Sequence, residues 1–152
     1  MSKEYTRVNF MRLRERITSF TDEHEYLHPL YNANFNYMGS KWSSIQEAYN
    51  ALVEEGYDIH RKLSLMGNII YHCYSQNDAM AAKLMETKGY WLQHTVKDHD
   101  NFWHNCSCLD CFMENGDNYY GRLVMEVRDY FLWKNKHHKV NSKRWELHYF
   151  DK

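Results

Sequence analysis

Three cysteines lie close together in the second half of the chain, at Cys106, Cys108 and Cys111. Structural zinc takes four ligands in a tetrahedral arrangement, often thiolates together with an imidazole. His104 or Cys73 would supply the fourth ligand. The Cys-x-Cys spacing is tighter than the Cys-x-x-Cys of most zinc knuckles, so three ordinary thiols in a packed loop are the alternative. The cluster therefore predicts either a structural zinc site or a small loop of buried thiols.

Residues on both sides of this cluster are of types that bind nucleotides. Trp103 offers a flat ring for stacking on a base or a sugar. A Gly-Asp-Asn turn ending at Asn118 precedes an apolar helix, whose first backbone amides suit a phosphate. Asn118 suits a sugar hydroxyl and Arg128 suits a phosphate. The structural alternatives are a core tryptophan, an Asn N-cap, and an arginine paired with Glu126 or Asp129 at the surface.

Several helices are needed to position these groups. Ser44 and Glu47 form a capping box, in which a hydroxyl lies three residues before a carboxylate. Asn77 is expected to cap a later helix, and Gly89 to stop it. The apolar spacing predicts helices over residues 44–52, 59–74, 77–88 and 117–133, with short strands over residues 14–20 and 145–149. The fold class expected is α+β, a helix-rich domain with a few short strands.

Length and composition limit the other possibilities. The 152 residues, 43% of them hydrophobic, fit one domain spanning 1–152, and there is no Gly/Ser-rich linker. No apolar run approaches the roughly 20 residues that span a bilayer, and no targeting signal is evident, so no membrane partner is expected. The crowded thiols fit a reducing compartment, which predicts a soluble cytoplasmic protein. The net charge of −1 indicates that the basic residues 134–144 form a solvated turn and do not bind nucleic acid.

Five segments match one family pattern. The pattern has an N-terminal strand ending in Phe, a Trp or Tyr before a Ser-Val-Glu-His-Ala-Tyr-Gln-Ala-x-Lys helix, a Phe-Trp-Gly turn, and a closing Gly-x-Asn-x-Leu-Gly-x-Leu-Leu-Met-x-x-Arg. The corresponding positions here are residues 17–20, Trp42, residues 44–53, residues 102–104 and residues 116–128. In these segments the chain resembles the NADAR family, which has the YbiA-like fold. Some members also carry a Cys-x-Cys-x-x-Cys insert after the Trp, as this chain does.

The resemblance implies a fold and a chemistry. Family members are associated with NAD and ADP-ribose metabolism and with cleaving the bond between a ribose phosphate and an amine or base. Their substrates include early riboflavin intermediates and ADP-ribose attached to guanine. A Lys on the first helix attacks C1 of the sugar as a Schiff base, and a Glu on the same helix handles protons. Trp42 and Asn50, which stand at family positions, are then expected to bind ligand together with Trp103, Asn118 and Arg128.

The chain departs from the family at the reactive positions. The family Glu falls on Gln46, the family Lys on Val53, and the Gln between them on Asn50. These positions follow i, i+4, i+7 spacing and therefore share one stripe of the helix. Gln cannot accept a proton at neutral pH, and Val has no nucleophile. The family's Leu-Ser-Asn loop is also replaced, by Leu27-His28-Pro29.

Three functions remain compatible with these residues. The favoured one is a protein that binds an ADP-ribose-like or ribose-phosphate ligand, with N-glycosidase activity weak or lost. The second is an active N-glycosidase with relocated groups, using Glu47 beside Gln46, or His28. Glu47 already has a structural role in the capping box with Ser44. The third is a protein-interaction scaffold, stapled by zinc, that binds an unknown protein partner and no nucleotide.

Overall fold

Helices dominate the structure, a computed structural model that describes residues 15–137. The order of elements is β1 (Arg16–Ile17), the 3-10 helix η1 (Asp22–Leu27), β2 (Phe35–Tyr37), β3 (Ser40–Trp42), α2 (Ile45–Leu52), α3 (Ile59–Ser75), α4 (Asp78–Glu86), β4 (Trp91–Leu92), β5 (Thr95–Val96), β6 (Asn105–Cys106) and α5 (Tyr119–Lys136). The predicted class, a helix-rich α+β fold with a few short strands, is confirmed. No helix within residues 15–137 has the length and apolar character needed to cross a bilayer.

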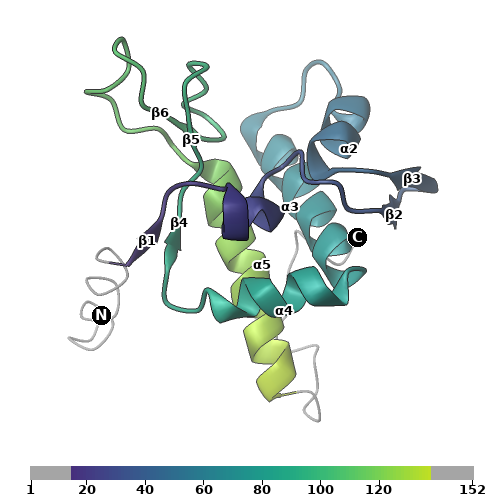
Figure 1. Cartoon of the computed structure of the whole chain (residues 1–152). Coiled ribbons are helices and arrows are strands. Elements are labelled where there is room, and N and C mark those ends of the chain that lie inside the picture. Colours follow the sequence, from purple (N-terminus) through teal and green to yellow (C-terminus); the bar gives the residue numbers. More distant parts are fainter. Residues whose placement is uncertain (1–14, 138–152) are drawn as a thin grey trace, which may run out of the picture.

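The core forms where α3 and α5 pack against each other, with α4 lying across α5 (Figure 1). Both long helices carry apolar side chains three or four residues apart, so each presents a continuous apolar stripe. The fully buried side chains include Met66, Ile69, Ile70, Tyr74, Tyr120, Val124 and Val127. Burial of these stripes accounts for the predicted helices over 59–74 and 117–133, which the structure confirms to within three residues at each end.

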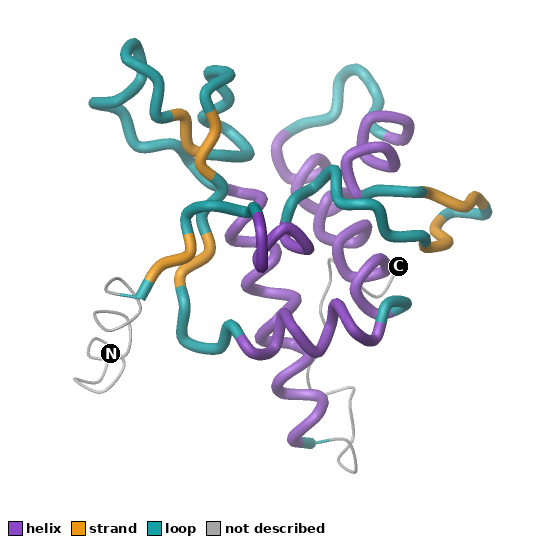
Figure 2. The backbone as a smooth tube through the Cα atoms, viewed as in Figure 1, coloured by secondary structure: helices purple, strands orange, loops and turns teal. Residues whose placement is uncertain are grey.

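The strands form three separate pairs around the helices, as Figure 2 shows in orange. β2 and β3 make an antiparallel hairpin whose turn residues, Met38 and Gly39, both have positive φ. β1 pairs with β4 and β5 pairs with β6, both in parallel. The strand predicted over 14–20 is therefore much shorter, because only Arg16 and Ile17 find ladder partners. The strand predicted over 145–149 lies outside the described residues.

Two predicted helix caps have different outcomes. The Ser44 hydroxyl accepts a hydrogen bond from the Glu47 backbone N–H at 3.1 Å, which confirms the start of α2. The Glu47 carboxylate accepts from the Ser43 backbone N–H at 2.8 Å, one residue earlier than in a standard capping box. Asn77 stands before α4 without a side-chain capping bond. Its amide donates to the carbonyl groups of Asn34 and Cys73 and so joins α4 to preceding segments.

Candidate ligand cavity and thiol cluster

A cavity of about 580 Å³ lies where the start of α2 meets the segments after β1, η1 and β5. Its volume falls in the range of roughly 300–1,000 Å³ that is usual for small-molecule sites. The Gln46 backbone N–H donates to the Pro29 carbonyl at 2.9 Å and so holds the start of α2 beside the end of η1. The lining residues are Ser19, Phe20, Thr21, His28, Pro29, Leu30, Gln46, His94, Thr95, Val96, Asp98, Asp100 and His104.

Gln46 is the member of the α2 stripe that reaches this cavity. Its side-chain amide donates to the Asn50 carbonyl oxygen at 2.9 Å, so the two polar side chains of the stripe are joined. Val53 is the C-cap residue of α2 and packs, partly buried, against the core. Asn50 and Val53 are not among the lining residues, and neither is Glu47. The described stripe therefore brings one uncharged amide to the cavity.

Three histidines, His28, His94 and His104, lie together in the cavity wall. The Nδ1 atoms of His94 and His104 lie 3.0 Å apart, and each of these residues is only 7% exposed. Phe20 stacks on the His94 ring at a centroid distance of 4.9 Å, and the His28 ring meets His94 edge-on at 4.8 Å. Burial, reinforced by His104 and His28, lowers the pKa of His94 to about 3, although Asp98 opposes the shift. These imidazoles are thus held uncharged at neutral pH by desolvation.

Asn118 has a structural role instead of the predicted role in binding a sugar hydroxyl. It is buried at the start of α5 in the left-handed conformation, with φ 53°. Its amide oxygen accepts from the His94 backbone N–H at 3.3 Å, and its amide nitrogen donates to the Leu92 carbonyl at 3.0 Å. Both functional atoms are occupied by backbone groups. The prediction that Asn118 binds a sugar hydroxyl is therefore corrected: the residue fastens α5 to β4 and to the segment that follows it.

Arg128 is also committed to the fold. Its side chain is 1% exposed, and its Nη1 donates to the carbonyl groups of Thr87 at 3.0 Å and Tyr90 at 2.8 Å. Its Nε pairs with the Asp129 carboxylate at 3.1 Å. The guanidinium thus closes the turn that follows α4. The predicted contact with a ligand phosphate is corrected, because a side chain this deeply buried and bonded is not accessible to a ligand.

Neither Trp42 nor Trp103 is among the residues that line the cavity. Trp103 packs edge-on against Tyr49 at a centroid distance of 5.2 Å and against Phe102 at 4.8 Å. Trp42 donates its indole N–H to the Tyr37 carbonyl at 3.0 Å. Both rings pack, partly buried, against the core. Ligand stacking by either ring stays a prediction.

The three thiols do come together, with His99 as their neighbour. One ligand atom from each of His99, Cys106, Cys108 and Cys111 lies within 4.8 Å of all the others. The parallel β5–β6 pair places Cys106 next to Val96, and the chain after β5 turns back at His99, whose φ is 70°. His99 also donates its backbone N–H to the Cys106 sulfur at 3.3 Å.

The two residues expected to complete this cluster lie elsewhere. His104 faces His94 across the cavity wall. Cys73 is buried in the core on α3, where burial raises the pKa of its thiol to about 12. The fourth member of the cluster is thus His99, in place of the expected His104 or Cys73. The available signal was the order His-x6-Cys-x-Cys-x2-Cys, which contains four ligands within 13 residues, 99–111.

The donor geometry fits a tetrahedral metal ion. With a Zn–S distance of about 2.3 Å and a Zn–N distance of about 2.0–2.1 Å, a tetrahedral site separates nitrogen from sulfur by about 3.6 Å. The His99 Nδ1 lies 3.4 Å from the Cys108 sulfur and 3.5 Å from the Cys111 sulfur. Burial alone would raise the pKa of Cys106, but backbone hydrogen bonds from Cys108 and His99 lower it overall. Thiolate formation, which metal binding requires, is favoured at Cys106, whereas burial raises the pKa of the Cys111 thiol to about 12.

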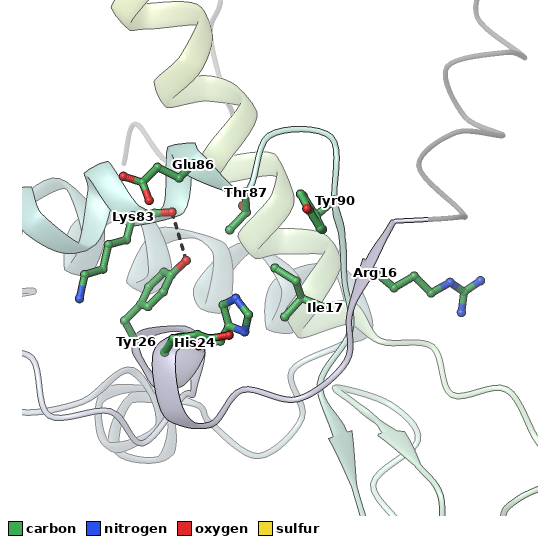
Figure 3. Close-up of a pocket in the computed structure, with 9 residues that line it drawn as sticks. Arg16, Ile17, His24, Tyr26, Lys83, Glu86, Thr87 and Tyr90 are labelled. Carbon is green, nitrogen blue, oxygen red and sulfur yellow. Dashed lines mark hydrogen bonds between the residues drawn. The ribbon is translucent and has the colours of Figure 1, made fainter.

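A second cavity, of about 660 Å³, lies between β1, η1 and α4 (Figure 3). The Tyr26 hydroxyl donates to the Lys83 carbonyl at 3.1 Å on one side of it, and the Arg16 side chain points away from it. Its wall mixes both charges, including Lys83 and Glu86. None of the residues predicted for a site lines this cavity. The Gln46 cavity is therefore the candidate ligand site.

Comparison with known proteins decides the fold. No protein-family model matches the sequence, and no curated protein matches it. The NMR structure of the E. coli protein YbiA matches with a TM-score of 0.62 over 84% of this chain and 94% of that chain, at 16% sequence identity. The chain has the fold of YbiA. At 16% sequence identity, the match to YbiA shows a shared fold and nothing more. It confirms the YbiA-like fold that the family resemblance implies.

Proposed function

We propose that this YbiA-like chain binds a ribose-containing ligand of the ADP-ribose or ribose-phosphate class, with N-glycosidase activity weak or lost. The observation that carries the proposal is the position of Gln46, which borders the cavity at the point where the family resemblance places the catalytic Glu. Its amide cannot take a proton there. Val53, at the position of the family Lys, brings no amine. On this view the chain is a divergent member of the family.

Thermal unfolding of the purified protein tests the proposal, with ADP-ribose, NAD and ribose 5-phosphate as probes. A ligand that binds only the folded state raises the Tm. We expect ADP-ribose to raise it and product analysis to find no cleavage of NAD. Gln46→Ala should reduce the Tm shift, whereas Glu55→Ala in the exposed turn after α2 should not. Release of nicotinamide from NAD would instead identify an active N-glycosidase.

We also propose that His99, Cys106, Cys108 and Cys111 hold a structural zinc ion. A closed set of four protein ligands leaves no open position for substrate, so the ion would cross-link the β5–β6 segment and would take no part in a reaction. All four cysteines are free thiols, which fits a cytoplasmic location where thiols stay reduced. Elemental analysis of the purified protein should find one zinc per chain. Absence of metal after expression in zinc-supplemented medium would favour a packed loop of thiols.

One observation favours the scaffold function as a second candidate. Leu109, Phe112 and Met113, beside the thiol cluster, are 89%, 66% and 81% exposed. Neighbouring exposed apolar side chains commonly mark a protein-interaction surface. If every nucleotide fails to raise the Tm, and a protein partner is lost on changing these three residues to Ser, the scaffold function replaces ligand binding.

A further inference from the structure

The charge of the Gln46 cavity is unusual for a phosphate site. Among residues 15–137, no lysine or arginine lines it, while Asp98 and Asp100 both do. Each carboxylate uses one oxygen within its own loop, Asp98 for the Asp100 backbone N–H and Asp100 for those of Phe102 and Trp103. Phosphate sites in proteins normally supply charge-assisted donors. A phosphate placed in this cavity would face two carboxylates without a basic side chain.

The His94–His104 pair restricts which donors the cavity can offer. A hydrogen bond between two Nδ1 atoms requires one ring to donate and the other to accept. The accepting ring must then carry its proton on Nε2, whatever the state of the other ring. When the donating ring is neutral, its Nε2 is an acceptor. Neither Nε2 atom has a hydrogen-bond partner among the described residues, and neither is sealed from solvent, since Asn68 Oδ1 is the one fully buried side-chain N or O atom of residues 15–137 that lacks a partner.

We propose that the cavity binds the uncharged nucleoside end of its ligand, the base and ribose, and leaves any phosphate outside. The Nε2–H of the accepting histidine donates to the base or to a ribose oxygen, and the other Nε2 accepts. The carboxylates of Asp98 and Asp100 accept from ribose hydroxyls. The inference rests on the proposed function and narrows its ligand class. Burial of His28 lowers the pKa of that third imidazole, so it adds no positive charge to the cavity wall at neutral pH.

Binding of matched ligands to the full-length protein tests the inference, with adenosine, AMP, ribose 5-phosphate and ADP-ribose compared at one ionic strength. We expect adenosine to bind at least as tightly as AMP, and ribose 5-phosphate to leave the Tm unchanged. Ribose 5-phosphate binding as tightly as adenosine would overturn the inference. If ADP-ribose binds and adenosine does not, the inference fails while the proposed function survives. If none of the four binds, both fail.

A conservative variant separates charge from folding. Asp98→Asn keeps the oxygen that accepts from the Asp100 N–H but removes the negative charge. We expect it to improve AMP binding relative to adenosine by about fivefold, which corresponds to about 1 kcal/mol for one charge pair in water. If Asp98→Asn leaves the ratio of the AMP and adenosine affinities unchanged, the ligand does not lie beside Asp98 and the inference is wrong.

NMR gives a direct readout of the histidine pair. Long-range ¹H–¹⁵N spectra of the wild-type protein should show a proton on Nε2 of either His94 or His104. Adenosine should shift the Nε2 resonance of at least one of the two rings. The inference is wrong if saturating adenosine leaves both Nε2 resonances in place.

Discussion

His99 and His104 lie five positions apart, yet they belong to different sites. The His99 imidazole contacts the thiols of Cys108 and Cys111, and His104 shares a hydrogen bond with His94 at the cavity. We therefore expect His99→Gln to weaken zinc binding by more than tenfold, because one of four ligands is lost. His104→Gln, the matched control, should keep wild-type affinity. Competition with a chromophoric chelator measures both, and the opposite ranking would make His104 the ligand.

His94 also makes stability depend on pH. An unfolded histidine titrates near pH 6.5, whereas burial, with His104 and His28 nearby, lowers the pKa of folded His94 to about 3. The unfolded state therefore binds more protons as pH falls. This contribution to stability is complete above about pH 6.5 and declines as the pH falls from there toward 3.

We accordingly expect the Tm to fall between pH 7 and pH 5. His94→Gln should remove part of that dependence, and His60→Gln on an exposed face of α3 should not. Each kcal/mol of lost stability corresponds to about 2–4 °C in a chain of this size. Calorimetry across that pH range checks the prediction, which is wrong if His94→Gln and the wild type have the same slope.

At the scale of elements, the start of α5 approaches the end of β4 very closely. A Cβ atom added at Gly121 would overlap the Leu92 carbonyl and the Asn118 side chain. Both groups are fixed by their mutual hydrogen bond, so neither can move away cheaply. Gly121→Ala should therefore destabilise the fold by about 1–3 kcal/mol or more. Denaturant unfolding measures the change. Arg122→Ala, at the exposed neighbouring position, is the control, and an equal effect of both variants would contradict the close approach.

The elements also show how far the sequence could predict the fold. Ser44 and the apolar spacing of α3 and α5 are local signals, and the corresponding helices are confirmed. The parallel pairs are only two residues long, too short for strand periodicity, and β1 finds its partner at Trp91. The partners of Arg128 are backbone carbonyls some forty positions away, so its burial has no local signature.

Part of the candidate site could also be predicted from the sequence, and part could not. Residue spacing places Gln46 in the first turn of α2, and of the three positions in the stripe it is the one that lines the cavity. The His94–His104 contact depends on β5 and β6 lying side by side, which no pattern in the sequence indicates. The same pairing brings His99 to the thiols.

For the molecule as a whole, the thiol cluster and the cavity share one segment. Asp98, Asp100 and His104 line the cavity, while His99 and Cys106 belong to the cluster. Removing zinc should therefore lower the Tm and weaken the Tm shift caused by ADP-ribose. A metal present at 1,000 times its Kd contributes about 4 kcal/mol of stability. Thermal unfolding with and without chelator measures both effects, and re-addition of zinc is the control.

One result would contradict the predicted coupling between zinc binding and ligand binding. If chelation leaves the ADP-ribose shift unchanged, the cavity wall is held by the segment's own hydrogen bonds. Those bonds include Asn101 accepting from the Cys106 N–H at 2.8 Å, and the Asn101 carbonyl accepting from the Asp117 N–H at 2.8 Å.

The parallel pairing of β5 and β6 has a consequence for chain length. Parallel neighbours usually need a dozen or more residues to return the chain to the same end of the sheet. Here residues 97–104, eight in number, make the whole return. Because this connection is so short, we expect one added residue to displace His99 from the thiol cluster or His104 from the cavity wall. Length variation is better accommodated beyond Cys111, where the exposed turn carrying Phe112 and Met113 can lengthen without moving either site.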